Sequence, residues 1–261
     1  MRKIFLLTLI ISISSVSGYS QSADDEVEVR NYVSFEMADS SYISGDYATA
    51  AAIYEEILST QGISQELYMN LGNAYFKMDQ IAKAILNYER AYLIDPSNSD
   101  VQFNLELARS RIVDKEVSVN EFFITVWINR LSTSLNVNQW SILAISFIVL
   151  MALAIGIFVL SNKTALKKVS FGISIISLVI SVLGMCFAAR QKNNLTNNGT
   201  AIIMSPSVTV KSTPNENGTD LFIIHDGRKV KVLDSSMKEW VEIRLNDGNE
   251  GWIPVDALEI I

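Results

Sequence analysis

Two copies of one pattern decide the fold of this chain: SFEMADSSYISGDYATAAAIYEEILSTQG at residues 34–62 and YMNLGNAYFKMDQIAKAILNYERAYLIDP at residues 68–96. The second copy follows the first at an offset of 34 residues. At this offset small residues coincide with small ones and aromatic residues with aromatic ones: Ala38 with Gly72, Ala50 with Ala84, and Tyr54 with Tyr88. A period of this length is typical of arrays built from stacked pairs of helices.

Apolar residues recur at helical spacing through this region, and they predict helices near residues 30–44, 47–59, 65–78, 81–93 and 99–113. The fourth helix stops before Pro96, because proline cannot continue a helix. The fifth has the polar outer face that the end of an array requires. We therefore assign two repeats and a capping helix to residues 30–118. Because two repeats bury little surface, we expect the array to lean also on a membrane, on the C-terminal residues or on a partner.

The second copy resembles the tetratricopeptide repeat (TPR), with tyrosine where that family prefers tryptophan and phenylalanine. The matching positions are Tyr68, Leu71, Gly72, Tyr75, Ala84, Tyr88, Ala91 and Pro96. The resemblance implies an α-helical TPR solenoid with a concave face that binds a protein or peptide. Carried over position by position, that face presents Phe35, Asp39, Tyr42, Met69, Asn73, Phe76 and Lys77.

The same resemblance implies roles for some of these positions. Asn73 matches the asparagine that hydrogen-bonds an extended backbone in peptide-binding members. Phe35 and Met69 stand where members that clamp a C-terminal carboxylate have basic residues. A mixed apolar and polar peptide, or a partner helix, is therefore the expected ligand. The alternative is that these side chains only cover the surface of the array.

Residues 1–20 resemble a secretory signal peptide. Two basic residues precede an apolar run over residues 4–13, and small polar residues follow. The run is short for a hydrocarbon core of about 30 Å. Cleavage is therefore the favoured interpretation, and an uncleaved anchor helix is the alternative. The acid-rich residues 21–29 are expected to form a solvated linker.

Residues 140–160 and 169–189 are two predicted transmembrane helices. Each is 21 residues long without a charged side chain, and at about 1.5 Å per residue each spans roughly 30 Å. The loop between them, residues 161–168, carries three lysines and no acid. By the positive-inside rule this loop is cytoplasmic. Both flanking parts of the chain then lie on the opposite side of the membrane.

Residues 119–139 precede the first span. Aromatic and aliphatic residues, among them Phe122, Phe123 and Trp127, recur there at roughly helical spacing. One interpretation is an amphipathic helix lying in the membrane interface. The other is a connector that packs on the repeats. The sequence leaves both open.

The C-terminal residues alternate in short runs typical of strands. After a polar tether at residues 190–200, strands are expected at residues 202–204, 208–211, 221–224, 229–233, 240–245 and 250–254. VTVKSTP at residues 208–214, Gly227 and GWIP at residues 251–254 resemble bacterial SH3-like domains. The resemblance implies a small all-β barrel of five or six strands over residues 201–261. Exposed aromatic residues can hold a peptide or a cell-wall ligand in such domains. Trp240 and Trp252 are the candidates here, although barrel core is the favoured interpretation for them.

Several classes of function are disfavoured. A net charge of −7 without a basic stripe argues against nucleic acid. The single cysteine, Cys186, lies in an apolar run and cannot form an intramolecular disulfide or a thiolate cluster. The single histidine, His225, has no evident companions. With no phosphate-binding, dinucleotide-binding, zinc-protease or nucleophile-elbow motif, we expect neither enzymatic activity nor a cofactor or metal.

The order of the parts makes this a multidomain membrane protein: signal peptide, TPR solenoid, two-helix transmembrane hairpin and SH3-like barrel. This order resembles the BatE-like TPR proteins of the aerotolerance (Bat) operons of Bacteroides-type bacteria. The resemblance implies an inner-membrane protein whose two folded parts are periplasmic. It also implies partners among von Willebrand A-type Bat membrane proteins, beside a MoxR-type ATPase.

Three functional hypotheses follow from these observations. The first is a non-catalytic scaffold that binds protein partners through the TPR groove and the SH3-like domain. The second is an envelope sensor whose SH3-like domain binds peptidoglycan. The third is a purely structural subunit of a membrane assembly.

Overall fold

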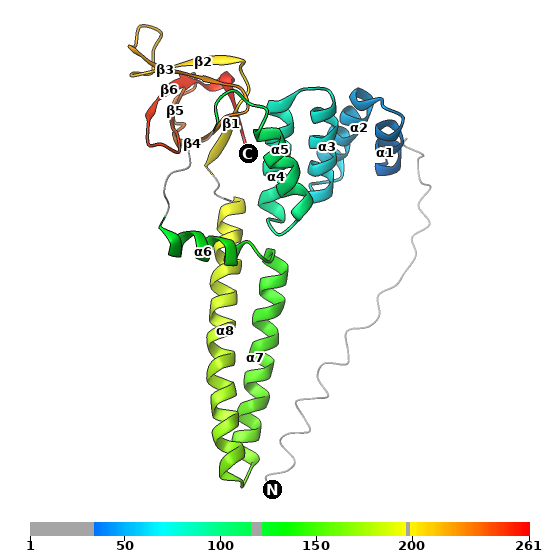
Figure 1. Cartoon of the computed structure of the whole chain (residues 1–261), viewed down its shortest axis with the longest axis vertical. Coiled ribbons are helices and arrows are strands. Elements are labelled where there is room, and N and C mark those ends of the chain that lie inside the picture. The colour runs from blue at the N-terminus through cyan, green and yellow to red at the C-terminus, as the bar shows by residue number, and fades with distance from the viewer. Residues whose placement is uncertain (1–33, 116–121, 197–198) are drawn as a thin grey trace. The chain divides into compact units, whose positions relative to one another are not determined.

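A computed structural model describes residues 34–115, 122–196 and 199–261 of the chain. The predicted signal peptide and acidic linker lie outside the described residues. The protein is mostly helical, with TPR-like helices, two long apolar helices and a C-terminal antiparallel sheet (Figure 1).

Five helices overlap the five predicted from the sequence: α1 (Phe35–Ile43), α2 (Tyr47–Thr60), α3 (Gln65–Lys77), α4 (Ile81–Ile94) and α5 (Ser99–Arg109). The first three begin at side chains that cap them, because the side-chain oxygens of Ser34, Asp46 and Ser64 each accept a hydrogen bond from the N–H three residues on. The loops turn through residues with positive φ, Gly45 at 87° and Asp79 at 62°.

Small residues allow the helices of the array to approach each other closely. Ala38, Ala50 and Ala84 are fully buried in one continuous helical core. Gly72 on α3 faces the ring of Tyr88 on α4, where a Cβ atom would lie 2.6 Å from a ring carbon. Tyr88 is itself buried. No side chain larger than hydrogen therefore fits at position 72 without displacing that ring.

Helices α7 (Val137–Leu160) and α8 (Thr164–Thr196) are long and apolar enough to cross a membrane. They run side by side as a hairpin (Figure 1). Gly184 packs against Ala144, and the rings of Trp140 and Phe187 lie 4.9 Å apart. Most of their large apolar side chains point outward and are exposed, as expected of helices that face lipid.

The hairpin differs from the predicted segments in two places. The loop predicted at residues 161–168 is only three residues long, because α8 already begins at Thr164. Lysine has a high helix propensity, so the lysines in this stretch are compatible with an early start of the helix. The tether predicted at residues 190–200 is helical as far as Thr196. Gln191 explains this extension, because its buried side chain donates to the carbonyl oxygens of Ser132 and Leu135.

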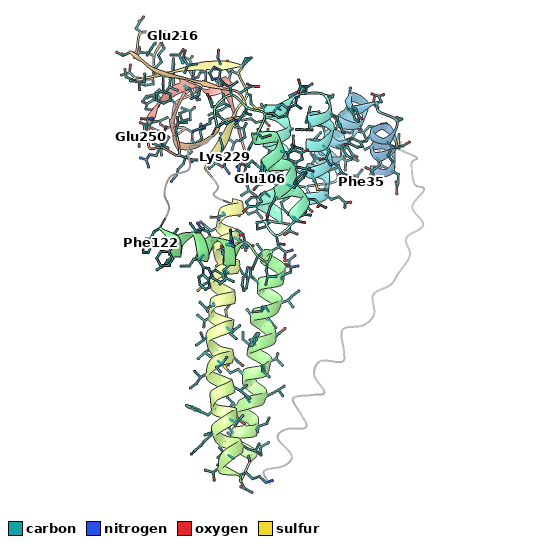
Figure 2. The ribbon with its side chains drawn as sticks, in the orientation of Figure 1. Phe35, Glu106, Phe122, Glu216, Lys229 and Glu250 are labelled. Carbon is teal, nitrogen blue, oxygen red and sulfur yellow. The ribbon has the colours of Figure 1, made fainter. Side chains whose placement is uncertain are left out.

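Helix α6 (Phe123–Ser132) lies beside the end of the hairpin that carries residues 137 and 191. The indole N–H of Trp140 donates to the Ser132 carbonyl at 3.0 Å, and Arg190 donates to the Asn129 side chain at 2.8 Å. The aromatic side chains of Phe122, Phe123 and Trp127 are exposed (Figure 2 labels the first). These aromatic side chains therefore do not pack on the repeats.

The C-terminal strands form one antiparallel sheet in the order β3-β2-β6-β5-β4-β1-β7. They are β1 (Thr200–Ile203), β2 (Ser207–Lys211), β3 (Asp220–His225), β4 (Lys229–Asp234), β5 (Trp240–Arg244), β6 (Glu250–Pro254) and β7 (Leu258–Ile260). Alternate residues such as Val210, Ile243 and Ile253 form its buried core. Seven strands are present where five or six were expected. The additional strand, β7, has only three residues, which is too short to show the alternation of apolar and polar residues that marks a strand.

The end of the helical array contacts the sheet through charged and apolar groups. The carboxylate of Glu89 on α4 is buried, with a side chain 1% exposed, and it pairs with Arg109 on α5 and with Lys229 on β4. Ile202 on β1 belongs to the helical core. Asp114 accepts hydrogen bonds from the backbone N–H of His225 at 2.6 Å. The array therefore packs against the C-terminal sheet. The sequence had led us to expect support from a membrane, from the C-terminal residues or from a partner.

We predict that Gly72→Ala destabilises the helical array. Its Cβ would overlap the buried Tyr88 ring, and overpacking of this kind costs about 1–3 kcal/mol of unfolding free energy. Denaturant unfolding followed by circular dichroism measures the loss. Gly156→Ala on α7 is the matched control, because a Cβ there meets open space. Equal stability of the two variants would show that the close approach is not tight.

Candidate functional site

A cavity of about 230 Å³ lies on the array among α1, α2 and α3. It is lined by Asp39, Tyr42, Ile43, Tyr54, Asn70 and Asn73. Three of the seven predicted groove residues, Asp39, Tyr42 and Asn73, thus come together from the two sequence copies. We take this cavity as the candidate partner site.

The side chain of Asn73 is held in one orientation by two donors. Its Oδ1 atom accepts hydrogen bonds from the Tyr88 hydroxyl at 2.8 Å and from Asn104 Nδ2 at 3.1 Å. Both lone pairs of that oxygen are therefore used. Within the described residues, the Nδ2 group of Asn73 has no acceptor, so it remains free to donate to a bound partner.

Asp39 lies across the same cavity and offers the opposite polarity. One of its carboxylate oxygens accepts from the Tyr54 hydroxyl at 2.5 Å. Burial, then the hydrogen bond to Asp39, raise the pKa of Tyr54 well above its usual value, while a hydrogen bond with Asn70 opposes them. Burial also raises the pKa of Tyr42. Both hydroxyls stay protonated at neutral pH and serve as donors, so the cavity combines an amide donor with a carboxylate acceptor.

The remaining predicted groove residues do not line this cavity. Phe35 on α1, labelled in Figure 2, packs edge-to-face on another ring, that of Tyr54, with 5.8 Å between the ring centroids. Met69 and Phe76 pack against the helical core, and the Arg111 guanidinium lies over the Phe76 ring. These three side chains therefore pack on other residues of the array. Lys77 is exposed at the end of α3.

Sequence reasoning missed four residues of the site: Ile43, Tyr54 and Asn70 in the cavity wall and Asn104 behind it. Asn70 lies three positions before Asn73 and therefore on the same face of α3. This spacing could have identified Asn70 from the sequence. Tyr54 was assigned to the core, and it is buried, but its hydroxyl reaches the cavity. Asn104 lies on the capping helix α5. No local pattern marks it, because its role depends on how α5 packs beside α3.

The two candidate tryptophans lie on the face of the sheet opposite the core. Trp240 pairs with Pro254, and Trp252 pairs with Glu242. The residues between them, Val241 and Ile253, are buried. Successive side chains on a strand point to opposite faces, so both tryptophans are directed away from the core. The favoured interpretation of Trp240 and Trp252 as core was wrong for this reason.

The described residues include no group of three or more His, Cys, Asp or Glu side chains that could hold a metal ion. The site chemistry consists of hydrogen-bond donors, acceptors and aromatic surface. Such an arrangement can bind a polypeptide segment, since an extended backbone presents both N–H and C=O groups.

Comparison with known families identifies two of the parts. A tetratricopeptide repeat model matches residues 66–98, which include α4 and all of α3 except its first residue. A bacterial SH3 domain model matches residues 206–259. No curated protein matches the chain. The TPR and the bacterial SH3 domain fit binding roles toward proteins or peptidoglycan.

Proposed function

We propose that this chain is a non-catalytic, membrane-anchored scaffold that binds a protein partner through its TPR groove and a second partner through its SH3-like domain. It acts in this proposal within a Bat-type complex linked to aerotolerance, beside von Willebrand A-type membrane proteins. The observation that supports this proposal most directly is the cavity lined by Asn73 and Asp39. Two hydrogen bonds hold the Asn73 side chain in one orientation, and its Nδ2 group can donate to a partner. The two apolar helices would anchor that cavity at a membrane.

The proposal places both folded parts on the periplasmic side of a bacterial inner membrane. A bacterial SH3 domain is consistent with an extracytoplasmic location. The turn between α7 and α8 contains Lys163 and is followed by Lys167 and Lys168, which favours a cytoplasmic position for it. The TPR helices and the sheet adjoin the other end of the hairpin.

We expect cysteine labelling to show this topology. In a Cys186→Ser background, a membrane-impermeant thiol reagent should label Glu216→Cys in intact spheroplasts, because Glu216 is exposed in the loop between β2 and β3 (Figure 2). It should label Lys163→Cys, in the turn, only after permeabilisation. The reverse pattern would place the folded parts in the cytoplasm and refute this localisation.

Substitutions at Asn73 test the groove. Asn73→Asp keeps the Oδ1 acceptor of Tyr88 and Asn104 but removes the free donor, so we expect partner capture to fall while the array stays folded. Asn73→Ala also leaves the buried Tyr88 hydroxyl unpaired, which costs about 1–3 kcal/mol. Circular dichroism reports folding in both variants.

Photo-crosslinking in cells measures the capture. A photoreactive residue at Ile43, which lines the cavity and is 84% exposed, should crosslink the partner. The same residue at Ile63, which is 64% exposed in the α2–α3 loop, is the matched control. Undiminished capture by Asn73→Asp, or equal crosslinking from both positions, would rule out the groove assignment.

A second candidate function is an envelope sensor whose SH3-like domain binds peptidoglycan. The observation that favours it is the outward direction of Trp240 and Trp252 on one face of β5 and β6. Half-buried tryptophans that face away from the core can stack on the sugar rings or peptide stems of a cell-wall ligand.

Sedimentation with purified peptidoglycan tests this candidate. The full-length protein in detergent should co-sediment, and the double variant Trp240→Ala, Trp252→Ala should lose most of the binding because both aromatic contacts are removed. Leu221→Ala, an exposed apolar position on edge strand β3, is the control and should bind normally. If the unmodified protein stays in the supernatant, the sensor candidate fails.

A further inference from the structure

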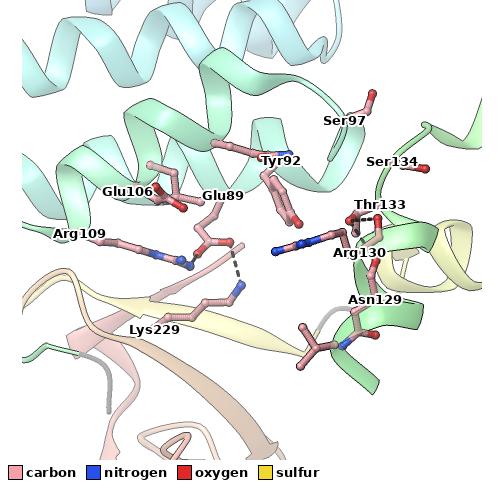
Figure 3. A pocket seen from close by; sticks show the side chains of 13 residues that line it. Glu89, Tyr92, Ser97, Glu106, Arg109, Asn129, Arg130, Thr133, Ser134 and Lys229 are labelled. Atoms are coloured by element: carbon pink, nitrogen blue, oxygen red, sulfur yellow. Dashed lines mark hydrogen bonds and ion pairs between the residues drawn. The ribbon is translucent and has the colours of Figure 1, made fainter. Parts of the chain in front are cut away.

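A second cavity, of about 550 Å³, shares no lining residue with the groove (Figure 3). Residues of α4, α5, α6 and β4 line it. Its charged side chains are Arg109, Arg130, Lys229, Glu89 and Glu106. Three cations against two acids leave an excess of one positive charge when all five are ionised. The cavity is therefore matched in charge to a monoanion.

The three cations are not equivalent. Arg109 and Lys229 are both engaged with the buried carboxylate of Glu89, the latter at 2.8 Å. Arg130, on α6, points into the cavity beside Tyr92 (Figure 3). Its guanidinium makes no hydrogen bond or ion pair with any residue that the structure describes. Arg130 thus carries the excess charge and all of its donors are available.

A neutral donor lines the same cavity. Asn129, one residue earlier on α6, also lines the cavity. Its Oδ1 atom accepts from Arg190 at 2.8 Å, which leaves the Nδ2 group to donate. A planar guanidinium and an amide donor that line one cavity suit the oxygens of a phosphate group, which arginine can bind with two parallel hydrogen bonds.

The polar cavity continues into an apolar one. Val126 and Arg130 also line a neighbouring cavity of about 470 Å³ whose other walls are Phe123, Ile124 and Trp127. This apolar surface lies on α6, which is attached to the ends of α7 and α8 by the hydrogen bonds of Trp140 and Gln191. A charged cavity adjoining an apolar one has the polarity of a lipid headgroup adjoining its acyl chains.

We infer that this pair of cavities binds an anionic phospholipid, with its phosphodiester at Arg130 and Asn129 and an acyl chain along Phe123 and Trp127. The inference rests on the proposed membrane anchoring of α7 and α8. The single negative charge of such a lipid matches the single excess positive charge. A phosphate monoester or inorganic phosphate would use the polar cavity alone and leave the apolar one empty.

Lipid binding by the full-length protein tests the inference. In neutral detergent, native mass spectrometry should show bound phosphatidylglycerol and much less phosphatidylcholine at equal concentration. Arg130→Gln should weaken phosphatidylglycerol binding roughly tenfold, as expected for the loss of a charge-assisted interaction. Lys192→Gln removes the same charge from an exposed position beyond Gln191 and should leave binding unchanged.

Several outcomes would overturn the inference. An equal loss in Lys192→Gln would show only general charge attraction. Inorganic phosphate or a phosphoserine peptide that displaces the lipid at similar concentration would assign the cavity to a soluble phosphate. Because Arg130 has no side-chain hydrogen bond or ion pair among the described residues, its variant should fold, and thermal unfolding without added lipid checks this. Trp127→Ala, at an exposed position, gives a second variant that should weaken lipid binding but not phosphate binding. Topology and partner capture are measured separately, so a failure here leaves the scaffold proposal standing.

Discussion

The buried carboxylate of Glu89 is the interaction on which the arrangement of the two folded parts depends. A carboxylate that is almost fully removed from water is tolerated only if cations and hydrogen bonds satisfy it. Arg109 supplies one partner from within the helical array, and Lys229 supplies the other from the sheet. Removal of one partner of such a pair typically costs about 3–5 kcal/mol. Separation of the array from the sheet would remove Lys229 and leave the buried Glu89 carboxylate with Arg109 as its ion-pair partner.

This constraint explains how so short an array can be stable. Two repeats and a capping helix leave an incomplete core, since stacked repeats normally share a continuous one. The sheet extends that core, with Ile202 buried in it and Met204 and Ile261 packed against it. On the other side, Asn136 of the hairpin donates to Asp95 after α4. The array is thus closed by its own sheet and hairpin rather than by further repeats.

The sequence predicted what is local and missed what depends on contacts between distant segments. The repeat offset, the helices and the long apolar runs were recognisable because helix periodicity and chain length determine them. Asn73 was recognisable from its position in the repeat. In contrast, Glu89 is a buried ion because α5 and β4 both pack against α4 there, and no local pattern indicates that packing. The tryptophans were misassigned because alternation identifies two faces of a strand but not which one is buried.

Helix α4 joins the two proposed sites. Tyr88 points toward α3, and its hydroxyl donates to the side chain of Asn73 in the groove. The next residue, Glu89, points toward the second cavity and forms ion pairs with Arg109 and Lys229. One rigid helix therefore sets the distance between a bound partner and a bound lipid headgroup. A partner held in this way stays near the membrane at high effective concentration, so that modest contacts made by each site suffice. A second weak contact, through the SH3-like domain, would then add to the first without requiring either to be tight.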